Sequence, residues 1–215
     1  MNYFVTFWIL LIISIAIHEL GHLIVALLCG IKVEAFSLGF GKILSKKTIK
    51  GIEFRWSAIP LGGYCKLYGE DTTEVGGWLS QRYLKKFLVL IAGVAFNFIA
   101  ACLCYYINYK SIRLGVKIDL LFYKFVLLKD DIGQLQLLLL SDTNWLLLQF
   151  SLINLGSAIL NILPFPALDG GHIVFLWLEK IWKNKFVKYY AVLNTIGFKL
   201  LILLQIAIVV FYWVL

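Results

Sequence analysis

Long apolar runs alternate with polar segments along the chain, and this pattern predicts membrane-spanning helices. An α-helix rises about 1.5 Å per residue, so about 20 apolar residues cross the hydrocarbon core of a bilayer. Four runs reach or approach this length: residues 4–29, 84–109, 145–163 and 196–215. We therefore predict an all-α polytopic membrane protein with about four transmembrane helices in one domain, residues 1–215.

The segment between the first two runs, residues 33–67, has a different pattern. Apolar and polar residues alternate through residues 52–58, which is the period of a half-buried strand, and Pro60 is expected to end it. We predict a small membrane-associated β-sheet or hairpin. Its edge could bind an extended substrate beside Phe54 and Trp56, or the hairpin could only rest on the bilayer; both interpretations stay open.

Composition supports the membrane class, because 61% of the residues are hydrophobic and only 15% are charged. The net charge of +8 does not indicate nucleic-acid binding once its distribution is considered. Ten basic residues lie from Lys32 through Lys86, in the first loop and at the start of the second run; four lie between the last two runs, against five between the second and third. The positive-inside rule then places the first and third loops in the cytoplasm and both termini on the extracytoplasmic side.

A metal-binding motif lies inside the first apolar run, at His18, Glu19 and His22. Ionisable residues are costly in a membrane helix, so they indicate a functional site. Residues four apart share a helix face, so both imidazoles can bind one Zn²⁺ while Glu19 acts as general base toward a water on the metal. At helical rise the motif lies roughly 21 Å from the outer end of the run and roughly 16 Å from the cytoplasmic end.

A catalytic zinc needs a third protein ligand and an open position. Two prolines stop the third apolar run at residues 164–166, and the backbone they free should line a polar cavity. Asp169 is the carboxylate in that stretch, so we predict that it completes a site of two histidines and one aspartate. His172 is interpreted as a supporting or helix-start residue, because a fourth protein ligand would close the site.

Two further amides are candidates for the site. Asn161 precedes the prolines and could hydrogen-bond the substrate backbone or the developing oxyanion, or bridge two helices. Asn97 lies in the second apolar run, where it could contact the site and the substrate or pack between helices.

The sequence resembles the site-2 protease family of intramembrane zinc metalloproteases (peptidase M50), and most closely its bacterial regulator-of-sigma-E protease branch. The resemblance rests on HELGH at residues 18–22 together with NILPFPALDGG at residues 161–171. It extends through shorter stretches at residues 39–41, 58–64 and 92–98, and along residues 168–180.

This resemblance implies zinc ligands at His18, His22 and Asp169, a general base at Glu19 and substrate handling at Asn161. It also implies regulated intramembrane proteolysis of single-pass membrane proteins, in the inner membrane of a bacterium, with the active site toward the cytoplasm. The oligomeric state is not indicated. An alternative function is a catalytically silent membrane scaffold that binds clients without cutting them, although such a scaffold would have little use for Glu19.

The chain departs from the family pattern in two places. Members of this branch carry one or two PDZ domains after the second span, whereas here a loop of residues 110–144 takes that place and is too short for a domain of about 100 residues. The family often has Gly-Pro-x-x-Asn in the second span, and this chain keeps Gly93 and Asn97 but has Val94 in place of the proline.

Overall fold

A computed structural model describes residues 3–70, 77–109, 145–182 and 192–204 of the chain. The predicted loop at residues 110–144 and the last part of the fourth predicted span lie outside these residues. The described elements, in chain order, are α1 (Tyr3–Leu28), β1 (Val33–Ile49), β2 (Ile52–Leu67), a 3-10 helix η1 (Trp78–Ser80), α2 (Tyr83–Tyr109), α5 (Trp145–Ile162), α6 (Asp169–Trp182) and a helix at Val192–Leu204.

Each predicted apolar run corresponds to a helix, at least over its described part. Among the described residues, two helices, α1 and α2, are long and apolar enough to cross a membrane, whereas α5 and the described part of the last helix, Val192–Leu204, are shorter. Large apolar side chains such as Ile9 and Leu103 are more than half exposed on α1 and α2, as expected where a helix faces lipid. The membrane class is therefore supported, and the count of four spans stays a prediction.

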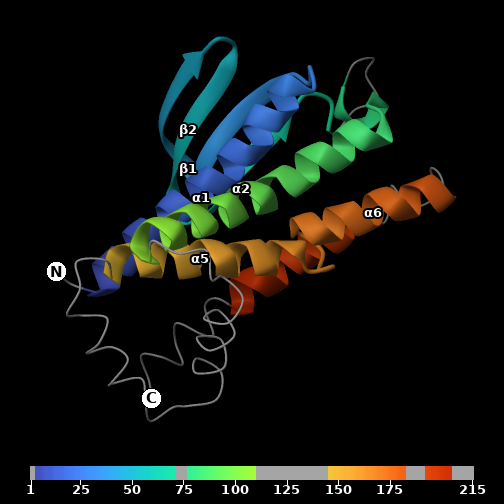
Figure 1. Ribbon diagram of the computed structural model, residues 1–215. Helices are drawn as coiled ribbons and strands as arrows, with labels where there is room; N and C mark the ends of the chain where they lie inside the picture. The colour runs from blue at the N-terminus through green and yellow to red at the C-terminus, as the bar shows by residue number, and fades with distance from the viewer. Residues whose placement is uncertain (1–2, 71–76, 110–144, 183–191, 205–215) are drawn as a thin grey trace.

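The elements are arranged around the pair α1 and α2 (Figure 1). The sheet packs against α1, and α5 packs along α2 on the other side, with α6 also in contact with α2. Buried polar groups join the helices: Ser14 Oγ donates a hydrogen bond to Asn154 Oδ1 at 3.1 Å, and Ser151 Oγ donates to the carbonyl of Ala101 at 2.9 Å. Such bonds are favoured in apolar surroundings, where an unpaired polar group is costly.

The predicted sheet is present, but its strands are longer than the sequence pattern indicated. Pro60 does not end β2, which continues to Leu67. Near its middle the pairing shifts: Ile59 pairs with Phe40, and Gly63 then pairs with Leu38. A proline is tolerated at such an irregularity because no regular ladder hydrogen bond is required there.

The first half of β1 lies between the two halves of β2. Residues 35–38 pair with residues 53–56 and also with residues 63–66, while residues 53–56 pair on their other side with the second half of β1. The expectation of a free strand edge at residues 52–58 is therefore wrong, because residues 53–56 at its centre are paired on both sides. Within the described residues, the second half of β2 (residues 63–67) is a sheet edge with one paired side.

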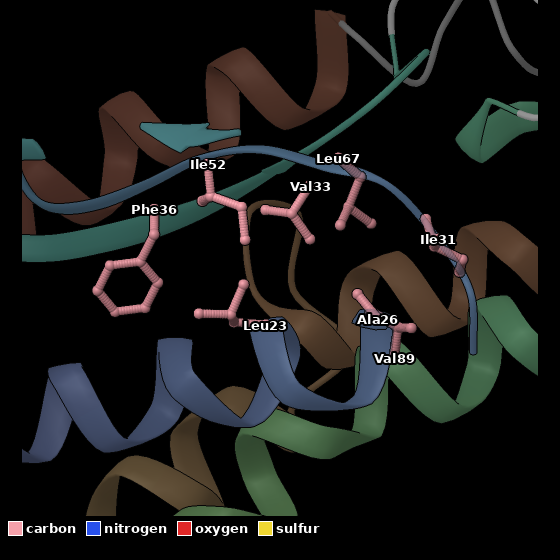
Figure 2. Packing of buried hydrophobic residues seen from close by; sticks show 8 residues of the cluster. All are labelled: Leu23, Ala26, Ile31, Val33, Phe36, Ile52, Leu67 and Val89. Carbon is pink, nitrogen blue, oxygen red and sulfur yellow. The ribbon is translucent and has the colours of Figure 1, made fainter. Parts of the chain in front are cut away.

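A hydrophobic cluster fixes the sheet on the helices (Figure 2). Leu23 and Ala26 of α1 face the apolar side chains of both strands, and Val89 of α2 closes the cluster from below. Burial of such side chains stabilises the packing by about 25 cal/mol per Å² of apolar surface. The sheet is thus held against the half of α1 that carries the metal motif.

A polar network joins the two halves of β2. Arg55 hydrogen-bonds Glu53 within the strand and donates from Nη1 to the hydroxyl of Tyr64 at 3.0 Å. Lys46 of β1 pairs with Glu53 at 2.9 Å. The hydrogen bond from Arg55, followed by that from Lys46, holds the pKa of Glu53 below its usual value. These contacts link the interior segment of the sheet to its edge.

Candidate metal centre

Helix α1 presents His18, Glu19 and His22 to the interior of the protein, and each is less than 10% exposed. The spacing of four residues places both imidazoles on one face of the helix. Their Nε2 atoms lie 3.1 Å apart. Helix α1 alone therefore supplies two of the three predicted metal ligands.

Asp169 comes from a turn between α5 and α6 and is the first residue of α6. The chain leaves α5 through Pro164 and returns at once, so that Gly170 lies directly on the end of α5. A Cβ at Gly170 would lie 2.2 Å from the carbonyl oxygen of Ile162. Only glycine allows the first turn of α6 to pack this closely, and this packing directs Asp169 toward α1.

The three donor atoms converge on one point. Asp169 Oδ2 lies 3.0 Å from His18 Nε2 and 3.4 Å from His22 Nε2. A tetrahedral zinc with ligand bonds of about 2.0 to 2.1 Å holds its ligand atoms about 3.3 Å apart. Apart from the two imidazoles, Asp169 Oδ2 is buried with no hydrogen-bond partner among the described residues, as expected for an atom that binds a cation. The residues present therefore fit a zinc ion with two histidines and one aspartate.

The tautomer of His22 agrees with metal binding. Its Nδ1 lies 2.7 Å from the carbonyl oxygen of Val89 in α2, so Nδ1 carries the hydrogen and donates it. In the neutral imidazole the lone pair is then on Nε2, the atom that faces Asp169 and His18. A backbone carbonyl is one of the usual partners of a metal-binding histidine in this role.

Gly93 of α2 leaves open the space beside the ligand atoms. A Cβ at this position would lie 2.4 Å from His22 Nε2 and 2.7 Å from His18 Nε2. Any larger residue would therefore press on the atoms that bind the metal. The sequence showed Gly93 as a retained position of the family pattern, but its contact with the imidazoles was not predicted.

Glu19 lies between the metal-binding atoms and the sheet. A Cβ at Gly63 would lie 2.8 Å from Glu19 Cγ, so the carboxylate side chain packs directly on the edge segment of β2. The general-base candidate therefore lies directly against this segment of the sheet. Neither this contact nor the role of Gly63 could be predicted from the sequence, because residues 19 and 63 are joined only by tertiary packing.

The structure places the remaining candidates as follows. Asn97 is fully buried, with its amide 3.4 Å from His18 Nδ1. Asn161 is half-buried in the last turn of α5, and His172 is half-buried in the first turn of α6. Phe54 packs against Phe36 with ring centroids 5.5 Å apart, and Trp56 is 46% exposed. Substrate contacts of these side chains stay predictions.

Comparison with known proteins identifies the family. The model of Peptidase family M50 matches residues 6–204, which is most of the chain. The chain belongs to this family. The resemblance to site-2 proteases that the two motifs predicted is confirmed.

Several curated relatives of this M50 chain match over about half its length. A "Putative zinc metalloprotease" of Chlamydia pneumoniae is 43% identical over 51% of this chain and 20% of its own length. A protein of the same name from Helicobacter pylori is 41% identical over 48% of this chain and 32% of its own. The regulator of sigma E protease of Haemophilus influenzae is 40% identical over 48% of this chain and 25% of its own. The M50 chain thus matches a third or less of each of these relatives.

Proposed function

We propose that this M50 chain is a zinc-dependent intramembrane endopeptidase. The observation that carries the proposal is the convergence of His18, His22 and Asp169 on one point, with Glu19 beside it. This donor set leaves a coordination position open, as catalytic zinc sites require. The names of the curated relatives agree with this chemistry.

Each residue of the centre has a distinct task in the proposed reaction. His18, His22 and Asp169 would hold Zn²⁺, which when bound supplies a Lewis acid that lowers the pKa of water to about 7 and polarises a carbonyl. Glu19 takes the proton of the attacking water and later passes it to the leaving amine. Burial keeps bulk water away from the carboxylate and strengthens its electrostatic interaction with the reacting groups.

The proposed substrates are transmembrane segments of single-pass membrane proteins, reached from within the bilayer. A helical segment must unwind before its peptide bonds become accessible, and an extended segment can then pair with a sheet edge. The register supports the second half of β2, residues 63–67, as this edge, in place of residues 52–58. The contact of Gly63 with Glu19 would bring a paired substrate close to the general base.

The positions of the basic residues support a multi-pass orientation in the bacterial inner membrane, with the loop that contains the sheet on the cytoplasmic side. The centre would then lie within the membrane toward the cytoplasm, and both termini outside. This arrangement lets the sheet receive substrates near the cytoplasmic surface.

One experiment separates the endopeptidase from a silent scaffold. Purified protein is analysed for zinc, and a model single-pass substrate is incubated with the wild type and with Glu19→Gln. We expect one zinc per chain in both proteins and cleavage reduced by about 10²-fold to 10⁴-fold in the variant, since proton transfer is lost while the ligands remain. Client binding without cleavage by the wild type would instead favour the scaffold.

A further inference from the structure

The side chain of Asn97 lies against the Nδ1 side of the His18 imidazole, whereas the Nε2 side faces the other two metal ligands, His22 and Asp169. Asn97 has no exposed surface, and its Nδ2 lies 3.4 Å from His18 Nδ1. Its Oδ1 is buried and has no hydrogen-bond partner in the part of the chain that the structure describes. A buried amide oxygen in this state is costly, so its surroundings require an explanation.

The tautomer of His18 decides which atom of the Asn97 amide should face it. His18 Nε2 points at Asp169 and His22, so metal binding through Nε2 leaves the hydrogen of the neutral ring on Nδ1. An amide NH₂ group facing that N–H would bring two donors together. A half-turn of the Asn97 amide exchanges its oxygen and nitrogen, which have nearly the same shape, and gives Nδ1–H an acceptor.

Helix α2 supports His22 in the same way. The Val89 carbonyl accepts the Nδ1 hydrogen of His22, and Asn97 follows Val89 by eight residues, about two helical turns. Gly93 lies between them and leaves the space next to both Nε2 atoms. One face of α2 therefore contacts the Nδ1 atoms of both imidazoles. Between these two contacts, Gly93 faces the Nε2 atoms that would bind the metal.

We propose that Asn97 is a positioning residue, whose amide oxygen accepts the Nδ1 hydrogen of His18 and so directs the Nε2 lone pair to the metal. This inference rests on the proposed function, because it assumes that His18 binds zinc. It assigns Asn97 to the metal centre and not to the substrate.

The test measures zinc affinity by competition with a chelator of known affinity, on the full chain in detergent. The variants are Asn97→Leu, which has a similar shape without an acceptor, and Asn97→Asp, which keeps acceptor oxygens and has no donor when ionised. We expect Asn97→Leu to weaken zinc binding by about 10-fold to 100-fold, the range typical of lost partners of metal-binding histidines. Asn97→Asp should bind zinc within about threefold of the wild type or more tightly, because a carboxylate is a stronger acceptor.

Asn154→Leu is the matched control. Asn154 is also a fully buried amide in the helix bundle, but it is bonded to Ser14 and the Phe150 carbonyl. This variant should lose thermal stability with its zinc affinity unchanged.

Unchanged zinc affinity in Asn97→Leu, or an equal loss in Asn97→Asp and Asn97→Leu, would overturn the role of the amide oxygen. If Asn97→Leu does not fold, Asn97→Asp decides: retained affinity supports an acceptor, and lost affinity supports a donor and overturns the inference. A wild type that binds zinc and cleaves keeps the proposed function intact in either case, whereas a wild type without zinc contradicts the proposed function itself.

Discussion

At the residue scale, the metal centre depends on small side chains as much as on its ligands. Gly93 lies opposite the two imidazoles, and Gly170 lies on the end of α5, each at a distance that leaves no room for a Cβ. These glycines let three backbone segments approach the site so closely that short side chains can reach one metal. Substitution of either glycine should therefore weaken metal binding even though the metal ligands keep their identity.

We expect Gly93→Ala to lower zinc affinity by about 100-fold or more, since its methyl carbon would lie 2.4 Å from His22 Nε2. The measurement is zinc content after dialysis against a weak chelator. Gly156→Ala is the control, because no atom of the described residues lies within 4 Å of its added Cβ on α5. That variant should keep its zinc and gain about 0.5 to 1 kcal/mol of stability from helix propensity. Equal zinc content in both variants would contradict the role of Gly93.

At the scale of elements, the shift in pairing near the middle of both strands determines which part of the sheet is an edge. The sequence pattern correctly placed a strand at residues 52–58, because alternation of apolar and polar residues is a local property. It could not show that this segment is interior, because its neighbours at residues 35–38 and 43–48 are set by shifts in pairing near Gly39 and Pro60. Strand order is decided by contacts between distant residues.

Proline substitutions distinguish an interior strand from an edge. Phe54→Pro should lower the melting temperature and cleavage together, because residue 54 is paired on both sides. Tyr64 and Cys65 are neighbours on the edge segment, so their N–H groups point to opposite sides. One of these two N–H groups points away from the sheet, so its replacement by proline breaks no hydrogen bond within the sheet. Of Tyr64→Pro and Cys65→Pro, that variant should retain the fold while cleavage falls. Full cleavage by the variant that folds would argue against substrate pairing at this edge.

At the scale of the whole molecule, the metal joins elements that are far apart in the sequence. His18 and His22 belong to α1, whereas Asp169 begins α6. A metal bound by these three residues would connect α1 to α6 and neutralise the buried carboxylate of Asp169. Metal binding should therefore be linked to global stability.

Removal of zinc with a chelator should lower the melting temperature, and added zinc should restore it. At a free zinc concentration 100 times its Kd, binding stabilises the folded state by about 2.7 kcal/mol. Asp169→Asn is the control, because its weakened site should lose most of the zinc-dependent shift. Thermal unfolding in detergent provides the measurement. An identical shift in the wild type and in this variant would mean that the stabilising zinc binds elsewhere.

The orientation in the membrane can be tested at the sheet. Ser45 is exposed in β1, and the loop that contains it is predicted to be cytoplasmic. In a variant without native cysteines, Ser45→Cys should react with an impermeant thiol reagent in inverted vesicles and not in intact cells. Labelling in intact cells would reverse the proposed orientation.

The sequence by itself determined the apolar helices and the pair His18 and His22 with Glu19, because hydrophobic runs and spacing along a helix are local properties. It also indicated Asp169, through the need for a third ligand and the family motif. Only the tertiary structure decided that Asp169 meets both imidazoles, that residues 63–67 form a sheet edge beside Glu19, and that Asn97 faces His18. The physical reason is that these contacts join residues separated by 25 or more positions, and their geometry depends on how closely whole helices and strands pack.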